Sequence, residues 1–231
     1  MAKILFVLTG ADHWTLSDGT THATGYWAEE FLAPYRALTA AGHDIVVATP
    51  QGTVPPVDQG SLTADSNGGQ EQADAAAAAI AATPELQHPI RITDAVLDDY
   101  AAVYYPGGHG AMEDLPTDQA SGELLAATLA SGKPLAIVCH GPAALLAATA
   151  ADGTSPFAGY RLTGFTNEEE TAAGFASRAP WLLQDRLVAL GADFRDAEPW
   201  APHTEVDRNL YTGQNPASSA PLAEELLKAL A

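Results

Sequence analysis

The 231-residue sequence predicts an α/β domain built on a mostly parallel sheet. Three observations support this fold class. Continuous apolar runs at 4–8, 102–105 and 135–138 have the length and composition of strands that are buried on both faces. Segments with helical patterns separate these runs, as in doubly wound sheets. The runs also end in glycine-containing loops, which is the edge where such sheets bind their ligands.

The first half of the chain contains two predicted strands and two predicted helices: strands over 4–8 and 44–49, and helices over 25–41 and 70–82. A polar loop that extends to Thr24 follows the first strand. The first helix carries an apolar stripe, contains Pro34, and is ended by Gly42. Because residues 53–69 are rich in turn formers, we expect 53–90 to be an insertion outside the core.

The second half continues the alternation, with predicted strands over 102–105, 135–138, 160–164 and 210–213, and predicted helices over 118–130, 142–146, 180–190 and 220–231. A polar segment, 167–170, lies between the strand at 160–164 and the next helix. No linker, repeat or low-complexity tract divides the chain, so a single domain over 1–231 is expected.

The charge and the cysteine content exclude several classes of binding partner. The net charge of −19 repels phosphate backbones and anionic membranes, so neither nucleic acid nor a membrane is an expected partner. The single cysteine excludes an intrachain disulfide, and no signal peptide or membrane span is recognisable. We therefore expect a soluble, cytoplasmic protein.

The most informative stretch joins the apolar run 135–138 to Cys139, Gly141 and Pro142. Gly141 permits a sharp turn, and Pro142 suits a first helical turn, so the stretch predicts a nucleophile elbow. Unpaired N–H groups at a helix N-terminus favour the thiolate, which is the reactive form of Cys139. The alternative is a small buried hydrophobic side chain. The adjacent His140 and the glycine-rich loop favour the reactive cysteine.

Two further features belong with this elbow. Gly107-Gly108-His109-Gly110 follows a strand and suggests that the N–H groups of Gly108 and His140 form an oxyanion hole. It is not a dinucleotide fingerprint. Glu30 lies at the margin of the apolar stripe of the first helix, where desolvation raises a carboxyl pKa. The sequence alone does not bring Glu30 to Cys139.

Five motifs occur in order and over nearly the whole chain: Thr24-Gly25 with Glu30 and Pro34, Pro106-Gly107-Gly108-His109-Gly110, Ala136-Ile137-Val138-Cys139-His140-Gly141-Pro142-Ala143, Leu162-Thr163-Gly164-Phe165-Thr166 and Thr212-Gly213-Gln214-Asn215-Pro216-Ala217-Ser218. Through these motifs the sequence resembles the ThiJ/PfpI superfamily, and within it the heat-shock chaperone branch whose members act as glutathione-independent glyoxalase III. The resemblance implies a flavodoxin-like three-layer α/β/α sandwich. It also implies that 4–8 and 135–138 are neighbouring strands.

The resemblance further implies roles for individual residues. Cys139 would be the nucleophile, His140 an acid/base group, and Glu30 a carboxyl in contact with the cysteine. Glu170 is the best match for an acidic residue that orients the histidine, with Glu168 and Glu169 as alternatives.

The implied reaction converts a 2-oxoaldehyde such as methylglyoxal to a 2-hydroxy acid through a hemithioacetal on Cys139. Its oxyanion would be held by the loop of Gly107 and Gly108 together with His140. No cofactor and no metal are expected. The resemblance implies a homodimer.

Other functions remain open. His203-Thr204-Glu205 has the His-x-Glu spacing of a class I glutamine amidotransferase, although we interpret this segment as a surface loop. Peptidase, deglycase or hydratase chemistry could use the same thiol, and a stress chaperone or redox sensor could use Cys139 as an oxidation switch. His13 and His22 lie in the loop after the first strand, but no close ligand spacing supports a metal site there.

Overall fold

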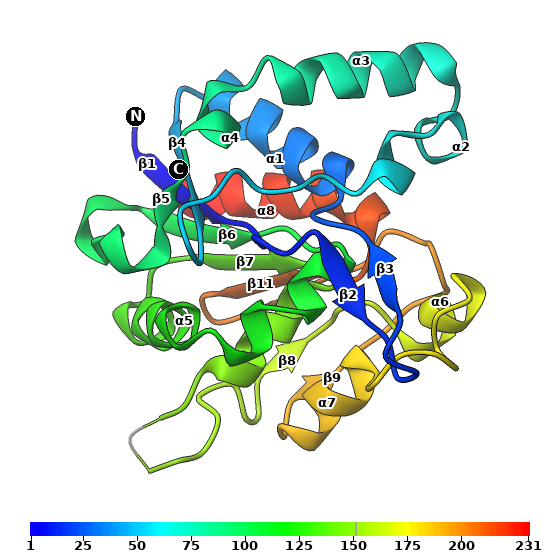
Figure 1. The fold of residues 1–231 in the computed structure, drawn as a ribbon. Helices are drawn as coiled ribbons and strands as arrows, with labels where there is room; N and C mark the ends of the chain where they lie inside the picture. Colours follow the sequence, from blue (N-terminus) through cyan, green and yellow to red (C-terminus); the bar gives the residue numbers. More distant parts are fainter. Residues whose placement is uncertain (151) are drawn as a thin grey trace.

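The structure is a computed structural model that describes residues 1–150 and 152–231. A seven-stranded sheet crosses its centre (Figure 1). From one edge to the other, the strands are β10 (Thr204–Asp207), β11 (Leu210–Gly213), β7 (Leu135–Val138), β6 (Ala102–Tyr105), β1 (Lys3–Val7), β4 (Asp44–Thr49) and β5 (Ile90–Arg91). Neighbouring strands are parallel except β10 and β11, which are antiparallel. The mostly parallel sheet that the sequence predicts is therefore confirmed.

Helices cover both faces of the sheet, which gives the three layers of the predicted sandwich. On one face α1 (Ala28–Ala40) packs against α8 (Ser219–Leu230), and α3 (Gln70–Ala81) packs against α1. Figure 1 shows these three helices above the sheet and α5 below it. There α5 (Gln119–Ser131) packs against a 3₁₀ helix over Gly141–Ala147. The remaining helices are α2 (Ala64–Asn67), α4 (Pro84–Gln87), α6 (Asn167–Ala172) and α7 (Leu183–Ala189).

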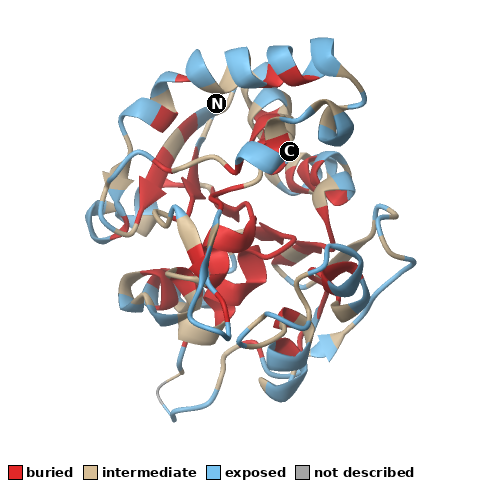
Figure 2. Cartoon of the chain, turned by 45° about the vertical axis from the view of Figure 1, so that its right-hand side comes forward, coloured by how far each residue is buried: buried red, intermediate tan, exposed pale blue. Residues whose placement is uncertain are grey.

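The core follows the central strands. Every residue of β6 and β7 is buried, and the last four residues of β1 are fully buried. Figure 2 shows this buried centre beneath largely exposed outer helix faces. Strands covered on both sides must be apolar at every position, which explains the continuous runs in the sequence. Within the described residues, no helix has both the length and the apolar character needed to cross a membrane.

The neighbour relation expected between the first strand and the elbow strand is wrong. β6 lies between them, because Ile4 of β1 is in register with Ala102 of β6, and Val103 of β6 with Leu135 of β7. β4 pairs on the other side of β1. The elbow strand β7 is consequently one strand further out, and the Gly107 loop at the end of β6 lies beside it.

Four local expectations also need correction. The loop after β1 contains an antiparallel ribbon of β2 (His13–Thr15) and β3 (Thr21–Ala23). β8 (Arg161–Leu162) pairs with β9 (Asp193–Phe194) rather than joining the central sheet. The segment after Pro202, expected to be a surface loop, is the edge strand β10. The helix after the elbow is 3₁₀. Strands of two or three residues, such as β2, β3 and β9, are too short for a periodic pattern to reveal them.

Candidate active site

Cys139 occupies a strained turn at the end of β7, as the elbow interpretation requires. Its φ is +59°, a left-handed conformation that non-glycine residues seldom adopt. The Cys139 N–H donates to the Gly213 carbonyl at 2.9 Å, and the Cys139 carbonyl accepts from the Phe165 N–H at 2.9 Å. These two backbone hydrogen bonds hold the strained residue between segments that are distant in sequence.

The glycine loop after β6 fits closely against this turn. A Cβ at Gly107 would lie 2.5 Å from the His140 backbone nitrogen, so no larger residue fits. Gly108 has a φ of +96°, and a Cβ there would overlap the Gly25 carbonyl. The backbone of this loop can therefore approach the cysteine.

His140 connects the cysteine to a buried carboxylate. Its Nδ1 lies 3.3 Å from Cys139 Sγ, and its Nε2 lies 2.8 Å from Glu170 Oε2. An ionised carboxylate can only accept hydrogen bonds, so Glu170 holds the proton on Nε2 and leaves Nδ1 free to accept the thiol proton. Cys139 is thus the nucleophile, His140 is the base that can activate it, and Glu170 is the group that orients the base.

Glu170 contacts a second histidine, His109, which the sequence analysis did not assign. His109 Nε2 lies 2.8 Å from Glu170 Oε1. Burial opposes the ionisation of Glu170, but the two histidines outweigh it and hold the Glu170 pKa well below its usual range. Burial, and then the charge of His140, lower the pKa of His109. The Gly-Gly-His-Gly motif was the available signal for this residue.

Of the three adjacent glutamates, Glu170 is the one that contacts His140. The segment around it is helix α6, which begins with a capping box in which the Thr166 side chain and Glu169 satisfy each other's backbone N–H groups. Glu169 also accepts from Asn215 at 2.8 Å, whereas Glu168 is exposed. The helix therefore presents Glu170 to the site and Glu168 to solvent.

Glu30, on α1, is fully buried on the other side of the cysteine. Its Oε2 accepts from the Gly107 N–H at 2.6 Å, while its Oε1 has no hydrogen-bond partner among the described residues. Burial raises the Glu30 pKa to about 8, although contact with the Cys139 thiol and the Gly107 N–H opposes this. The structure thus brings Glu30 to Cys139. The Gly107 N–H donates to Glu30, and the part of Gly107 in holding the oxyanion stays a prediction.

The expectation that the resting Cys139 is a thiolate is wrong. Cys139 is only 3% exposed, and burial, with the charge of Glu30 next, raises its pKa well above the usual value. The Gly108 N–H opposes this increase without overcoming it. A short 3₁₀ helix provides a weak dipole compared with this desolvation. The thiol must therefore lose its proton during the reaction, with His140 Nδ1 as the nearest base.

Cys139 opens onto a cavity of about 250 Å³, here called the inner cavity. Its walls are His22, Trp27, Asp58, Gly60, Gly108, His109, Cys139, His140, Phe165, Ala173, Phe175, Trp200 and Pro216. Trp14 stacks on His109 with ring centroids 4.8 Å apart, and Phe165 lies 4.3 Å from His140. Aromatic rings therefore fix both imidazoles at the base of a small, largely apolar space.

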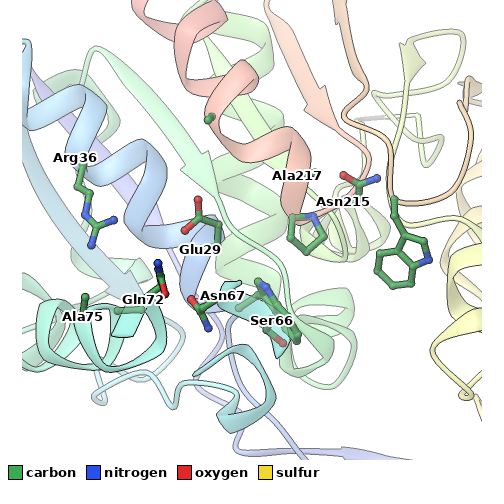
Figure 3. A pocket seen from close by; sticks show the side chains of 13 residues that line it. Glu29, Arg36, Ser66, Asn67, Gln72, Ala75, Asn215 and Ala217 are labelled. Atoms are coloured by element: carbon green, nitrogen blue, oxygen red, sulfur yellow. The ribbon is translucent and has the colours of Figure 1, made fainter. Parts of the chain in front are cut away.

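A larger pocket of about 810 Å³, the outer pocket, adjoins the inner cavity and shares Trp27, Trp200 and Pro216 with it. Figure 3 shows Glu29 and Arg36 of α1 together with Asn67 and Gln72 of the 53–90 insertion. Arg36 makes no salt bridge with the described residues. The insertion thus supplies polar groups beside the entrance to the cysteine.

The other candidate histidines lie elsewhere. His13 Nδ1 is 2.7 Å from Asp12 at the surface, and His22 packs on Phe175 in the inner cavity. His203 Nε2 lies 3.2 Å from Glu205, on β10, and His203 does not line the inner cavity. The His-x-Glu segment therefore does not reach the cysteine as an amidotransferase site would require.

The fold and the site define a class of protein: an α/β protein with a cysteine nucleophile elbow supported by a histidine and a glutamate. Comparison with protein families gives the particular family. The DJ-1/PfpI family model matches residues 21–229, and the chain belongs to this family.

Similar proteins differ in their named activities. Protein/nucleic acid deglycase HchA from Pseudomonas aeruginosa (strain UCBPP-PA14) is 31% identical over 243 residues, which cover 99% of this chain and 80% of the relative. The crystal structure of glyoxalase III from Candida albicans has 25% identity and a TM-score of 0.82, and covers 99% of this chain and 97% of that one. A human glutamine amidotransferase-like class 1 domain-containing protein 1 is 39% identical over 129 residues, covering 55% of this chain and 58% of the relative.

Proposed function

We propose that this protein converts methylglyoxal and similar 2-oxoaldehydes to 2-hydroxy acids without glutathione. The observation that carries the proposal is the placement of Cys139 between His140 Nδ1 and the buried Glu30 at the base of the inner cavity. A cavity of about 250 Å³ suits a three-carbon substrate. The similarity to the Candida albicans glyoxalase III supports the same reaction.

The reaction begins with proton transfer from the Cys139 thiol to His140 Nδ1, 3.3 Å away. The sulfur then adds to the aldehyde carbon and forms a hemithioacetal. The oxygen of that carbon becomes negative, and the backbone N–H groups of Gly108 and His140 are the donors we assign to it. The carboxylate of Glu170 stabilises the imidazolium that His140 becomes.

The second stage is an internal redox step. The former aldehyde carbon loses its proton, an enediol forms, and a proton is delivered to the neighbouring carbon. The first carbon is thereby oxidised to a thioester and the second reduced to an alcohol, so no external oxidant is needed. Glu30 has a pKa of about 8 and can release or accept a proton near neutral pH. Water then cleaves the thioester and regenerates the thiol.

Replacement of Cys139 tests the proposal. We expect Cys139→Ser to abolish the conversion of methylglyoxal to lactate, followed by NMR, while the circular dichroism spectrum stays unchanged. The exposed Glu168→Ala is the matched control and should keep full activity. Lactate production at the wild-type rate by Cys139→Ser would refute the mechanism. The absence of dicarbonyl turnover by the wild type, with aggregation still suppressed, would favour a chaperone.

A second candidate is a deglycase that acts on adducts of 2-oxoaldehydes. The outer pocket favours it, because it adjoins the inner cavity and could hold the larger part of an adduct. The Pseudomonas aeruginosa relative carries this name. Arg36 suits a carboxylate in such a substrate.

The hemithioacetal of methylglyoxal with N-acetylcysteine separates the two candidates. If adducts bind in the outer pocket, Arg36→Ala should raise KM about tenfold for the adduct, through the loss of a charge-assisted hydrogen bond, and leave KM for free methylglyoxal unchanged. Lys228→Ala, which removes an exposed cation from α8, is the control. Equal KM values for the adduct in wild type and Arg36→Ala would contradict this role.

A further inference from the structure

His109, His140 and Glu170 form a group of three potential metal ligands that the mechanism does not fully use. One ligand atom from each lies within 4.8 Å of the others, and this is the one such group of three or more within the described residues. Both histidines direct Nε2 at the same carboxylate, at 2.8 Å in each case. The two nitrogens contact different oxygens of that carboxylate, so the donor atoms of all three side chains surround one small space.

We propose that His109, His140 and Glu170 bind a divalent transition-metal ion such as Zn²⁺, and that the bound ion inactivates Cys139. The binding part depends only on the geometry of these three side chains. The inactivation part rests on the function proposed above.

The donor set has the chemistry that such an ion requires. Two imidazole nitrogens and one carboxylate are three protein ligands typical of zinc, with the fourth position left to water. With bonds to zinc of about 2.0–2.2 Å, tetrahedral ligands are roughly 3.3 Å apart. Each N···O pair must therefore widen by about half an ångström, and the two Nε2 atoms, which lie within 4.8 Å of each other, must reach the same separation. Both histidines line the inner cavity, which gives an ion a route to them.

The surroundings also favour a cation here. Trp14 stacks on His109 at 4.8 Å and Phe165 lies 4.3 Å from His140, so the rings are already oriented and little ordering is required. Glu170 accepts from both imidazoles and brings carboxylate oxygens to the site. The protein's net charge of −19 attracts cations to it.

Binding would reverse the arrangement of protons on His140. Without metal, the Nε2 proton faces Glu170 and the bare Nδ1 faces the sulfur. A metal on Nε2 displaces that proton, and the neutral ring then carries its proton on Nδ1. Nδ1–H donates to the sulfur instead of accepting from it, so His140 can no longer deprotonate the thiol. No redox change is involved.

Cobalt(II) substitution provides a test that does not depend on activity. The purified full-length protein is titrated with Co²⁺ and followed by absorption spectroscopy, and with Zn²⁺ by calorimetry. We expect one ion per chain, ligand-field bands of a nitrogen and oxygen site, and no sulfur-to-cobalt charge-transfer band. Cys139→Ser should bind with the same affinity. His109→Gln should bind at least about tenfold more weakly, whereas His22→Asn, which alters a nearby histidine outside the group, should bind like the wild type.

Three results would overturn the site: a charge-transfer band that disappears in Cys139→Ser, unchanged affinity in His109→Gln, or no binding by the wild type. Glu170→Gln is the second variant if His109→Gln does not fold. Zn²⁺ should also inhibit methylglyoxal conversion reversibly, with recovery after EDTA. If the wild type binds the ion but has no such activity, the proposed function fails and the metal site stands. Binding without inhibition would refute the inactivation.

Discussion

At the scale of single residues, the site depends on two buried carboxyl groups with opposite electrostatics. Glu170 accepts from two histidines and stays ionised. Glu30 is fully buried, has one oxygen without a hydrogen-bond partner among the described residues, and keeps its proton to about pH 8. One carboxylate orients the base, and the other is suited to proton transfer at the sulfur. Environments that separate two pKa values in this way are typical of acid/base pairs in enzymes.

The orienting role of Glu170 gives the first prediction. Glu170→Ala removes the acceptor that holds the His140 Nε2 proton, and we expect kcat/KM for methylglyoxal to fall about 10² to 10⁴-fold. Steady-state kinetics measure the change. Glu168→Ala, two residues earlier on the same helix and exposed, should leave kcat/KM unaltered. Equal activity of the two variants would show that Glu170 does not orient the base.

The raised pKa of Glu30 gives a prediction for stability. The Glu30 carboxyl has a pKa of 4.5 in the unfolded chain and about 8 in the folded protein, so between these pH values it is protonated in the folded state only. Its contribution to the free energy of unfolding is therefore fully present below about pH 4.5 and is lost as the pH rises toward 8. The wild type should lose about 1 kcal/mol per pH unit from this group between pH 5.5 and 8.

Glu30→Gln should lack this loss, since an amide does not titrate. Urea unfolding across the same pH range measures the difference between the two proteins. Glu170 does not disturb the comparison, because its lowered pKa moves its loss of stabilisation to acidic pH, below this window. Parallel pH profiles for the wild type and Glu30→Gln would contradict the raised pKa.

At the scale of elements, the position of the elbow depends on the packing of α5 against the 3₁₀ helix Gly141–Ala147. Gly122 is the closest point of approach, since a Cβ there would overlap the Ala147 carbonyl. The elbow's other support is β11, which accepts the Cys139 N–H through Gly213. The sulfur is thus placed by elements on both sides of β7.

Gly122→Ala tests this packing. Within a helix, alanine has an intrinsic helix propensity about 1 kcal/mol more favourable than that of glycine, so the substitution would stabilise α5 if there were space for the added methyl group. We expect instead a net loss of about 1–3 kcal/mol, measured by thermal unfolding, because the 3₁₀ helix must move away. Gly132→Ala, at the end of the same helix with nothing within 4 Å of the added Cβ, should cost only about 1 kcal/mol. A stabilised Gly122→Ala would disprove the close contact.

At the scale of the whole molecule, the net charge of −19 makes self-repulsion a general destabilising contribution. Raising NaCl from about 0.01 M to 0.15 M shortens the screening length from roughly 30 to 8 Å and should raise Tm. Differential scanning calorimetry checks this, and a Tm that falls over the same range would contradict it. The same charge predicts no measurable binding of duplex DNA at physiological salt. The homodimer stays a prediction that sedimentation can test.

The sequence was sufficient for features that depend on neighbouring residues. The apolar runs predicted the strands that are buried on both faces, and Cys139, Gly141 and Pro142 predicted the sharp turn of the elbow, in which Cys139 has a φ of +59°. The adjacency of Cys139 and His140 also placed the base beside the nucleophile. Such features follow from steric rules and periodicity that act over a few residues.

Tertiary structure alone decided the contacts between distant segments. The pairing of His140 with Glu170, 30 residues away, and of Glu30 with the loop 77 residues later depends on how the helices dock on the sheet. The contact of His109 with Glu170 depends on the same docking. The protonated state of the Cys139 thiol also depends on it, because desolvation is a property of the packed interior. A sequence specifies which groups are present, but their burial and mutual distances arise only when the layers close around them.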